Sequence, residues 1–216
     1  MTAPALILDF GGVISRTLFE THAITEKVLG LPAGCLTWRG PFEPEGDSLW
    51  RAMQSGELSE RDYWIQRTLE VGELVGENWT EMSQFVIAAR GADIDAIIRP
   101  EALATITEAR ALGAKVAVLS NELDLFYGAG FGQTLSFMEE DDIIIDATYT
   151  KILKPDPRAY NHCAEALQLA CESCVFVDDQ FKNIRGAQQV GMQTVHFDVQ
   201  RVEQSFQQAL DLLQHT

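Results

Sequence analysis

The chain has 216 residues, of which 46% are hydrophobic, and its formal net charge at pH 7 is −16. This length suits one domain, or one domain with a smaller insertion. The negative charge argues against nucleic acid or an anionic membrane surface as a general partner. No apolar run approaches the ~18 residues that a membrane-spanning helix needs, and no signal-peptide pattern precedes the first apolar run. The four cysteines are too sparse for a disulfide scaffold. These features predict a soluble, cytoplasmic protein.

The first predicted element is a short buried strand over residues 5–8. It ends at Asp9, and Gly11 and Gly12 then interrupt it. Because a buried carboxylate is costly unless it is neutralised, and ligands bind at the carboxyl ends of parallel strands, Asp9 is a candidate nucleophile or metal ligand. The alternative is a turn aspartate that caps the next segment, which is common before Gly-Gly.

Residues 16–90 show helical patterns and no buried strand. The predicted helices cover residues 19–29, 46–54, a segment that begins after Ser59, and 78–89. Ser59 and Asp62 resemble a capping box, with an acid where Glu or Gln is usual. Short helices in succession predict a small helical bundle.

After Asp95 the pattern changes to alternating strands and helices. The predicted strands are residues 115–121, 143–146, 174–179 and 194–197. The predicted helices are one that begins at Pro100 and ends before Gly113, and those over residues 157–169, 182–190 and 201–213. Such alternation indicates an α/β fold with a doubly wound parallel sheet. We therefore expect a Rossmann-like core over residues 1–15 and 95–216, with a helical insertion over residues 16–94.

Polar side chains follow the predicted strands in a set that suits phosphoryl transfer: Asp9, Ser120 with Asn121, Lys154, and Asp178 with Asp179. A carboxylate nucleophile can form an aspartyl-phosphate and divide hydrolysis into two easier steps. Its attack on an anionic phosphate requires positive charge, which Lys154 and a Mg²⁺ ion held by the aspartates would supply. Ser120 and the amide of Asn121 are candidate donors to the phosphoryl oxygens.

Each of these residues also has a structural alternative. Ser120 and Asn121 could cap a helix, Lys154 could be a surface lysine before a turn, and Asp178 with Asp179 could cap the following helix. All of these structural alternatives holding together is improbable, so the ordered set at several strand ends favours the functional interpretation.

The sequence resembles the haloacid dehalogenase-like (HAD) superfamily in four segments: residues 9–13 (DFGGV), 119–121 (LSN), 154–157 (KPDP) and 177–183 (VDDQFKN). The resemblance covers nearly the whole chain, including the insertion, which is similar to the superfamily's small helical cap after the first motif. Residues 53–59 and Gly11 further resemble a bacterial branch with sugar-phosphate phosphatases such as glucose-1-phosphatase.

The resemblance implies a hydrolase with a Rossmann-like core and Asp9 as its nucleophile. It implies that Ser120, Asn121, Lys154 and Gly12 bind substrate, and that Ser120, Asn121 and Lys154 share in catalysis. Magnesium would be bound by Asp9, the Gly11 carbonyl and Asp179, with Asp178 nearby. The expected function is Mg²⁺-dependent hydrolysis of a small phosphorylated metabolite, with sugar phosphates among the candidates. The pattern names neither the particular substrate nor an oligomeric state.

One position departs from the superfamily's phosphatases, most of which carry a general acid two residues after the nucleophile. Gly11 occupies that position, and losing a general acid typically costs on the order of 10²- to 10⁴-fold in rate. A good leaving group, the cap or a water could compensate. The superfamily's dehalogenases also lack this acid, so a metal-independent 2-haloacid dehalogenase that uses Asp9 remains an alternative, although Asp178 and Asp179 favour the phosphatase. A non-catalytic binding module that kept the fold is a second alternative.

Overall fold

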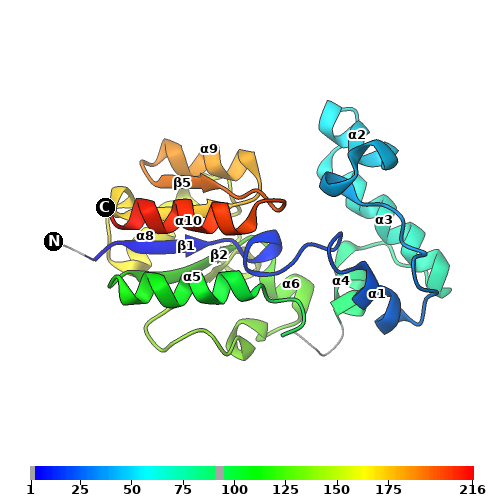
Figure 1. Cartoon of the computed structure of the whole chain (residues 1–216), viewed down its shortest axis with the longest axis horizontal. Coiled ribbons are helices and arrows are strands. Elements are labelled where there is room, and N and C mark those ends of the chain that lie inside the picture. The colour runs from blue at the N-terminus through cyan, green and yellow to red at the C-terminus, as the bar shows by residue number, and fades with distance from the viewer. Residues whose placement is uncertain (1–2, 91–94) are drawn as a thin grey trace. The chain divides into compact units, whose positions relative to one another are not determined.

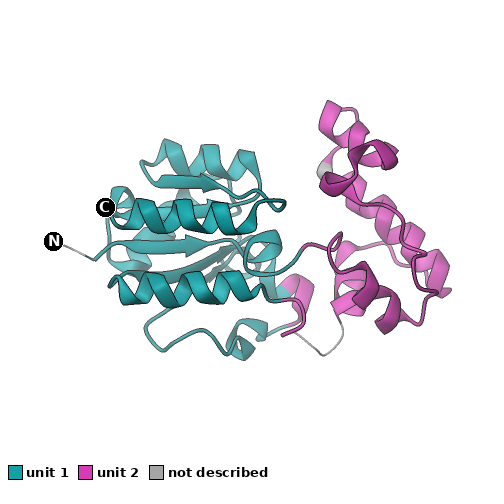
Figure 2. Ribbon diagram, in the orientation of Figure 1, with its two compact units in different colours: residues 1–16, 98–124, 129–216 teal, residues 17–97, 125–128 magenta. Residues whose placement is uncertain are grey.

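A computed structural model describes residues 3–90 and 95–216. The chain divides into two compact units (Figure 2). The sheet unit comprises residues 1–16, 98–124 and 129–216, and the helical unit comprises residues 17–97 and 125–128. The chain thus leaves the sheet unit after Arg16 and returns to it at Ile98. None of the described helices is long and apolar enough to cross a membrane.

Within the described residues, the sheet unit contains five parallel strands in the order β3-β2-β1-β4-β5 (Figure 1). Their bounds are β1 (Ala5–Leu8), β2 (Lys115–Ser120), β3 (Ile143–Asp146), β4 (Cys174–Asp178) and β5 (Gln193–His196). The predicted α/β fold with a parallel sheet is confirmed. Because the strands are parallel, their carboxyl ends lie at one edge. The strand order reverses between β1 and β4, and ligands of open α/β sheets bind at such a switch point.

Helices cover both faces of this sheet, as expected for strands that are apolar throughout. On one face α5 (Pro100–Ala111) packs beside α10 (Val202–Leu213), and on the other α8 (Pro157–Leu167) packs beside α9 (Phe181–Gln189). Side chains of β1 alternate between the faces, so Ala5 and Ile7 join the cluster under α8 and α9. The central strands are therefore buried on both sides.

The helical unit contains α1 (His22–Leu29), α2 (Ser48–Ser55), α3 (Glu60–Val75) and α4 (Met82–Arg90). The Ser59 hydroxyl accepts a hydrogen bond from the Asp62 backbone N–H at 3.1 Å, as the capping-box pattern predicts, but the Asp62 carboxylate accepts from this hydroxyl at 2.6 Å and not from the Ser59 backbone N–H. Four of the nine described buried residues in the core cluster of this unit are aromatic: Phe19, Trp38, Tyr63 and Phe85.

Two short helices that the sequence did not predict follow the strand ends. They are α6 (Leu123–Tyr127) and α7 (Ala147–Thr150). Asp146, the last residue of β3, accepts hydrogen bonds from the backbone N–H groups at the start of both: Leu123 at 3.2 Å, Asp124 at 2.8 Å and Thr148 at 2.8 Å. One buried carboxylate therefore caps the N-termini of two helices. Single 3₁₀ turns occur at Gly40–Phe42, Pro44–Gly46, Phe131–Thr134 and Cys171–Ser173.

Candidate active site

Three aspartates meet at the carboxyl edge of the sheet, where β1 and β4 end side by side. Asp9 follows β1, Asp178 is the last residue of β4, and Asp179 comes next. One carboxylate oxygen from each lies within 4.8 Å of the others. Asp178 is fully buried and Asp9 is 8% exposed. The fold thus brings together carboxylates that are about 170 residues apart in the sequence.

Lys154 lies between two of these carboxylates. Its Nζ is 2.8 Å from Oδ1 of Asp9 and 2.6 Å from Oδ2 of Asp178. Lys154 is 4% exposed, so the alternative of a surface lysine is wrong. Burial opposes the charge of Lys154, but Asp178 and Asp9 outweigh it and raise the pKa of the ammonium group. Lys154 therefore remains a cation.

Lys154 has one positive charge but pairs with two carboxylates. Burial raises the pKa of Asp9 from 3.8 to about 6, the neighbouring Lys154 counteracts this rise, and Asp178 adds to it. When Asp9, Asp178 and Lys154 are all ionised, these three groups carry a net charge of −1, and Asp179 is a further carboxylate beside them. Hard carboxylate oxygens with excess negative charge are the donor set that Mg²⁺ prefers, so these residues fit that ion.

Asp178 is held by more donors than the sequence indicated. The Gln180 backbone N–H donates to its Oδ1 at 2.8 Å, and the Asn183 amide donates to both oxygens at 3.0 and 3.1 Å. The Tyr160 hydroxyl in turn donates to the Asn183 carbonyl at 2.7 Å. Gln180 is itself the N-cap residue of α9, so this contact does not cap the helix, and the helix-capping alternative does not hold for Asp178. Asp179 is partly exposed.

Asn121, in the second motif (residues 119–121), holds the loop that contains Lys154, called here the lysine loop. Oδ1 of Asn121 accepts from the Lys154 backbone N–H at 2.7 Å, and Nδ2 of Asn121 donates to the Lys154 carbonyl at 3.1 Å. The helix-cap alternative does not hold for this asparagine, since Asp146 caps α6. Ser120 is the buried last residue of β2 and lies opposite Asp146 in the strand register.

The chain after Asp9 forms one wide turn over Phe10–Ile14. Gly12 has φ +80°, a conformation that favours glycine. Gly11 has φ −70° and ψ 122°, which any residue adopts, and a Cβ added there would meet nothing within 4 Å. Only Gly12 is therefore required as glycine by its backbone.

Close packing of α9 fixes the lysine loop from the other side. A Cβ on Gly186 would lie 2.7 Å from the Pro155 carbonyl oxygen and 2.8 Å from the Tyr160 hydroxyl. This glycine therefore allows α9 to approach the residue that follows Lys154. Asn183, Tyr160 and Gly186 all support the site, and sequence reasoning did not assign them a role.

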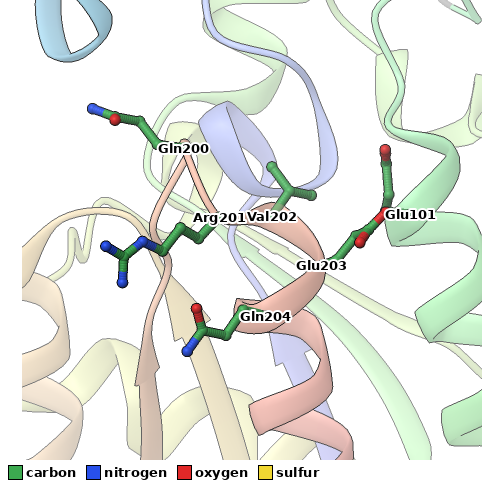
Figure 3. Close-up of a pocket in the computed structure, with 6 residues that line it drawn as sticks. All are labelled: Glu101, Gln200, Arg201, Val202, Glu203 and Gln204. Atoms are coloured by element: carbon green, nitrogen blue, oxygen red, sulfur yellow. The ribbon is translucent and has the colours of Figure 1, made fainter.

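A separate hollow of about 370 Å³ lies at the beginnings of α5 and α10 (Figure 3). Its lining includes the carboxylates of Glu101 and Glu203, and the Arg201 side chain, which points away from them. None of the predicted site residues lines it. Its position gives no reason to add these residues to the candidate site.

Comparison with known proteins agrees with this geometry. A family model described as haloacid dehalogenase-like hydrolase matches residues 4–191. Phosphatase MT3486 of Mycobacterium tuberculosis (strain CDC 1551 / Oshkosh) is 28% identical over 202 residues, which cover 92% of this chain and 88% of that protein.

Two solved structures share the fold. The HAD hydrolase YfnB of Bacillus subtilis, crystallised with magnesium, is 17% identical with a TM-score of 0.59, and the match covers 91% of this chain and 87% of that one. The L-2-haloacid dehalogenase RSc1362 is 16% identical with a TM-score of 0.57, covering 99% and 100%. At these identities the likeness shows the fold alone. The family model, however, spans most of the chain and all four motifs, which confirms the resemblance found in the sequence. We conclude that this chain belongs to the haloacid dehalogenase-like hydrolases.

Proposed function

We propose that this protein is a Mg²⁺-dependent phosphatase that hydrolyses a small phosphorylated metabolite through an aspartyl-phosphate. The observation that carries the proposal is the cluster of Asp9, Asp178 and Asp179, with carboxylate oxygens within 4.8 Å of one another and the buried Lys154 between Asp9 and Asp178. A dehalogenase attacks carbon and releases a halide, and it needs no metal. For such an enzyme, more clustered carboxylates than Lys154 neutralises would only cost stability. The curated relative MT3486, named a phosphatase, supports the same choice.

In the proposed reaction, a carboxylate oxygen of Asp9 attacks phosphorus, and the bond from phosphorus to the leaving oxygen breaks. The leaving oxygen departs with the electron pair. Water then attacks the aspartyl-phosphate, which releases inorganic phosphate and regenerates Asp9. Lys154 holds the Asp9 carboxylate at 2.8 Å and supplies positive charge beside the anionic substrate. Ser120, Gly12 and the amide of Asn121 are the proposed donors to the phosphoryl oxygens.

Asp9, Asp179 and the Gly11 carbonyl are the proposed direct ligands of Mg²⁺. Asp178 lies within reach of the same ion, but its oxygens already accept from Lys154, Gln180 and Asn183. We therefore assign it mainly to holding Lys154 and the metal-binding loop. When bound, Mg²⁺ would neutralise charge between the carboxylate nucleophile and the phosphoryl group.

The helical unit, predicted as residues 16–94, is the proposed cap that selects the substrate, which we expect to be a cytoplasmic metabolite such as a sugar phosphate. The assignment rests on its insertion between Asp9 and the second motif. Residues 91–94 of this range lie outside the described residues.

The deciding experiment compares phosphate release from p-nitrophenyl phosphate and a panel of sugar phosphates with halide release from 2-haloacids. We expect phosphate release with Mg²⁺, its loss in excess EDTA, and recovery when Mg²⁺ is restored. Halide release that persists in EDTA would establish the dehalogenase instead. Inactivity in both assays, with a folded protein, would favour the binding module.

Gly11 leads to a second test of the same reaction. Without an acid at this position, the rate should depend steeply on the pKa of the leaving group, so aryl phosphates and sugar 1-phosphates should react faster than glycerol phosphate. The backbone at Gly11 accepts a side chain, so Gly11→Asp is a suitable companion variant. It should flatten this dependence. An equally flat dependence in the wild type would mean that another group donates the proton.

A further inference from the structure

Arg99 is a buried cation next to the candidate site that no motif includes. It is 3% exposed and immediately precedes α5, where the chain has returned from the helical unit. Its guanidinium donates two hydrogen bonds to one acceptor, the Gly12 carbonyl: Nε at 3.3 Å and Nη2 at 3.1 Å. Its backbone N–H also donates to the Ile14 carbonyl at 2.9 Å. Arg99 thus holds the turn after Asp9 at two places.

The guanidinium of Arg99 also lies over an aromatic ring. Its Cζ is 5.7 Å from the ring centroid of Phe197, which directly follows β5. Phe197 is buried and packs edge-on against Phe206 of α10, with 4.9 Å between the ring centroids. The ring is therefore a fixed surface for a cation.

The same end of β5 holds the loop that carries Asp178 and Asp179. The Phe197 backbone N–H donates to the Asp178 carbonyl at 2.9 Å. Nε2 of the preceding residue, His196, lies 3.0 Å from the Asp179 carbonyl. A carbonyl only accepts, so Nε2 of His196 carries the proton in this contact.

These contacts form one path: Gly12 to Arg99, Arg99 to Phe197, and Phe197 to Asp178. We infer that Arg99 is a positioning residue. It fixes the turn after the nucleophile relative to the Asp178–Asp179 loop through its cation–π contact with Phe197. This inference rests on the proposed function, since these two loops would supply the metal ligands. Outer residues that orient ligands typically affect metal affinity or activity by about 10- to 100-fold.

The test is Arg99→Lys, which keeps the charge but cannot reproduce the two hydrogen bonds of the guanidinium. The matched control is Arg110→Lys in the same unit. Arg110 is also a guanidinium that donates to a backbone carbonyl, that of Phe137 at 2.9 Å, and it also pairs with Asp142. Denaturation of both variants gives the loss of stability that each substitution causes.

Two readouts separate positioning from folding. Calorimetry with Mg²⁺ alone should show about a 10- to 100-fold weaker affinity for Arg99→Lys and no change for Arg110→Lys. The kcat for p-nitrophenyl phosphate should fall by a similar factor, with a much smaller change in KM. Equal losses in both variants, or wild-type values in Arg99→Lys, would overturn the inference.

A third readout does not depend on metal or substrate. Hydrogen exchange of the peptide that contains Phe10–Ile14 should be at least about 10-fold faster in Arg99→Lys than in wild type, and unchanged in Arg110→Lys. If the wild type neither binds Mg²⁺ nor releases phosphate, the proposed function fails while this readout still decides the inference.

Phe197→Leu provides a second variant should Arg99→Lys fail to fold. It removes the ring and leaves the Gly12 contact, so we expect the same changes at smaller size. In the double variant, the fold-loss of Mg²⁺ affinity should be smaller than the product of the fold-losses in the two single variants, because both substitutions act through one contact. A fold-loss equal to that product would mean that Arg99 and Phe197 act independently, and it would contradict the proposed path.

Discussion

Asp9 and Asp47 are both buried carboxylates that face a buried cation, one in each unit. Asp47 accepts hydrogen bonds from Arg67 at 2.5 Å, from the Tyr63 hydroxyl at 2.8 Å and from the Trp50 backbone N–H at 2.9 Å. Arg67 is 7% exposed, and its guanidinium lies 5.2 Å from the ring centroid of Trp38. Here one buried carboxylate meets one guanidinium, which also contacts the partly exposed Glu70 at 2.6 Å, and fixed donors engage both oxygens of Asp47.

At the sheet edge, in contrast, two buried carboxylates, Asp9 and Asp178, share one lysine, and Asp179 lies beside them. Asp9, Asp178 and Lys154 are buried, as Asp47 and Arg67 are, so burial alone does not distinguish a structural cluster from a functional one. The charge balance does. In the helical unit, the buried charges of Asp47 and Arg67 neutralise each other. The cluster at the sheet edge, in contrast, would be stabilised by an added cation. The predictions below test this difference.

The largest effect is expected from Asp9→Asn. Loss of the nucleophile should reduce kcat by roughly 10⁴-fold or more. The same variant should be more stable in EDTA at pH 7, by on the order of 1–3 kcal/mol, because the pKa of Asp9 is raised to about 6 and its charge is costly there. The gain should disappear as the pH falls below about 4, where Asp9 is neutral in the folded and unfolded states. Urea denaturation at pH 7 and pH 4 measures it, and a loss of stability at pH 7 would contradict the charge argument.

Lys154→Met should affect both catalysis and folding. From sequence alone one would expect a mainly catalytic effect. The structure changes this expectation, because removing Lys154 leaves two buried carboxylates without their cation, at a cost of about 3–5 kcal/mol.

Magnesium should return part of the stability that Lys154→Met loses, and the variant should gain more from Mg²⁺ than the wild type does. Thermal denaturation with and without Mg²⁺ measures this difference. Equal gains would mean that the metal and the lysine do not neutralise the same charges.

Asp47→Asn is the opposite case. It should destabilise the protein by about 3 kcal/mol, because Arg67 loses its buried acidic partner and, among the described residues, keeps Glu70, whose side chain is 47% exposed. Magnesium affinity should stay at the wild-type value, since no proposed ligand is touched. Denaturation and calorimetry on the same preparation measure both quantities. A large loss of Mg²⁺ affinity would refute the division into a structural and a functional cluster.

The sequence predicted much of the sheet and of the candidate site. Buried strands are short apolar runs, and the parallel arrangement brings their ends to one edge, so Asp9, Lys154 and Asp178 could be placed together. Asp146 shows where this reasoning stops. It ends an apolar strand as Asp178 does, yet three backbone N–H groups surround it. A strand-end acid has the same appearance in sequence whether it caps helices or meets a lysine.

The roles of Arg99 and His196 could not be predicted from the sequence for another reason. Their contacts are between side chains and distant backbone carbonyls, and 87 residues separate Arg99 from Gly12. A carbonyl acceptor exists at every residue, so it leaves no pattern in the sequence. Gly186 likewise resembles any helical glycine until Pro155 and Tyr160 are seen next to it.

The smallest predicted effect is a pH dependence that belongs to the helical unit. His22 is 4% exposed, and its ring centroid lies 4.3 Å from that of Trp38, whose other contacts include Arg67. Burial, together with Arg39, lowers the pKa of His22 from 6.5 to about 4. The unfolded chain therefore takes up the proton first as the pH falls. The contribution of neutral His22 to stability is complete above about pH 6.5 and is lost progressively toward pH 4.

His22→Gln isolates this contribution, because the other titrating groups are shared with the wild type. Between pH 7 and pH 4.5 in EDTA, the wild type should lose on the order of 1–3 kcal/mol more stability than the variant does. Asp9 titrates over part of the same range with the opposite sign, since its pKa is raised, so the two proteins must be compared at each pH. Urea denaturation at half-unit steps provides the two curves. Parallel curves would show that His22 accepts a proton in the folded protein as easily as in the unfolded chain, which would contradict the lowered pKa of His22.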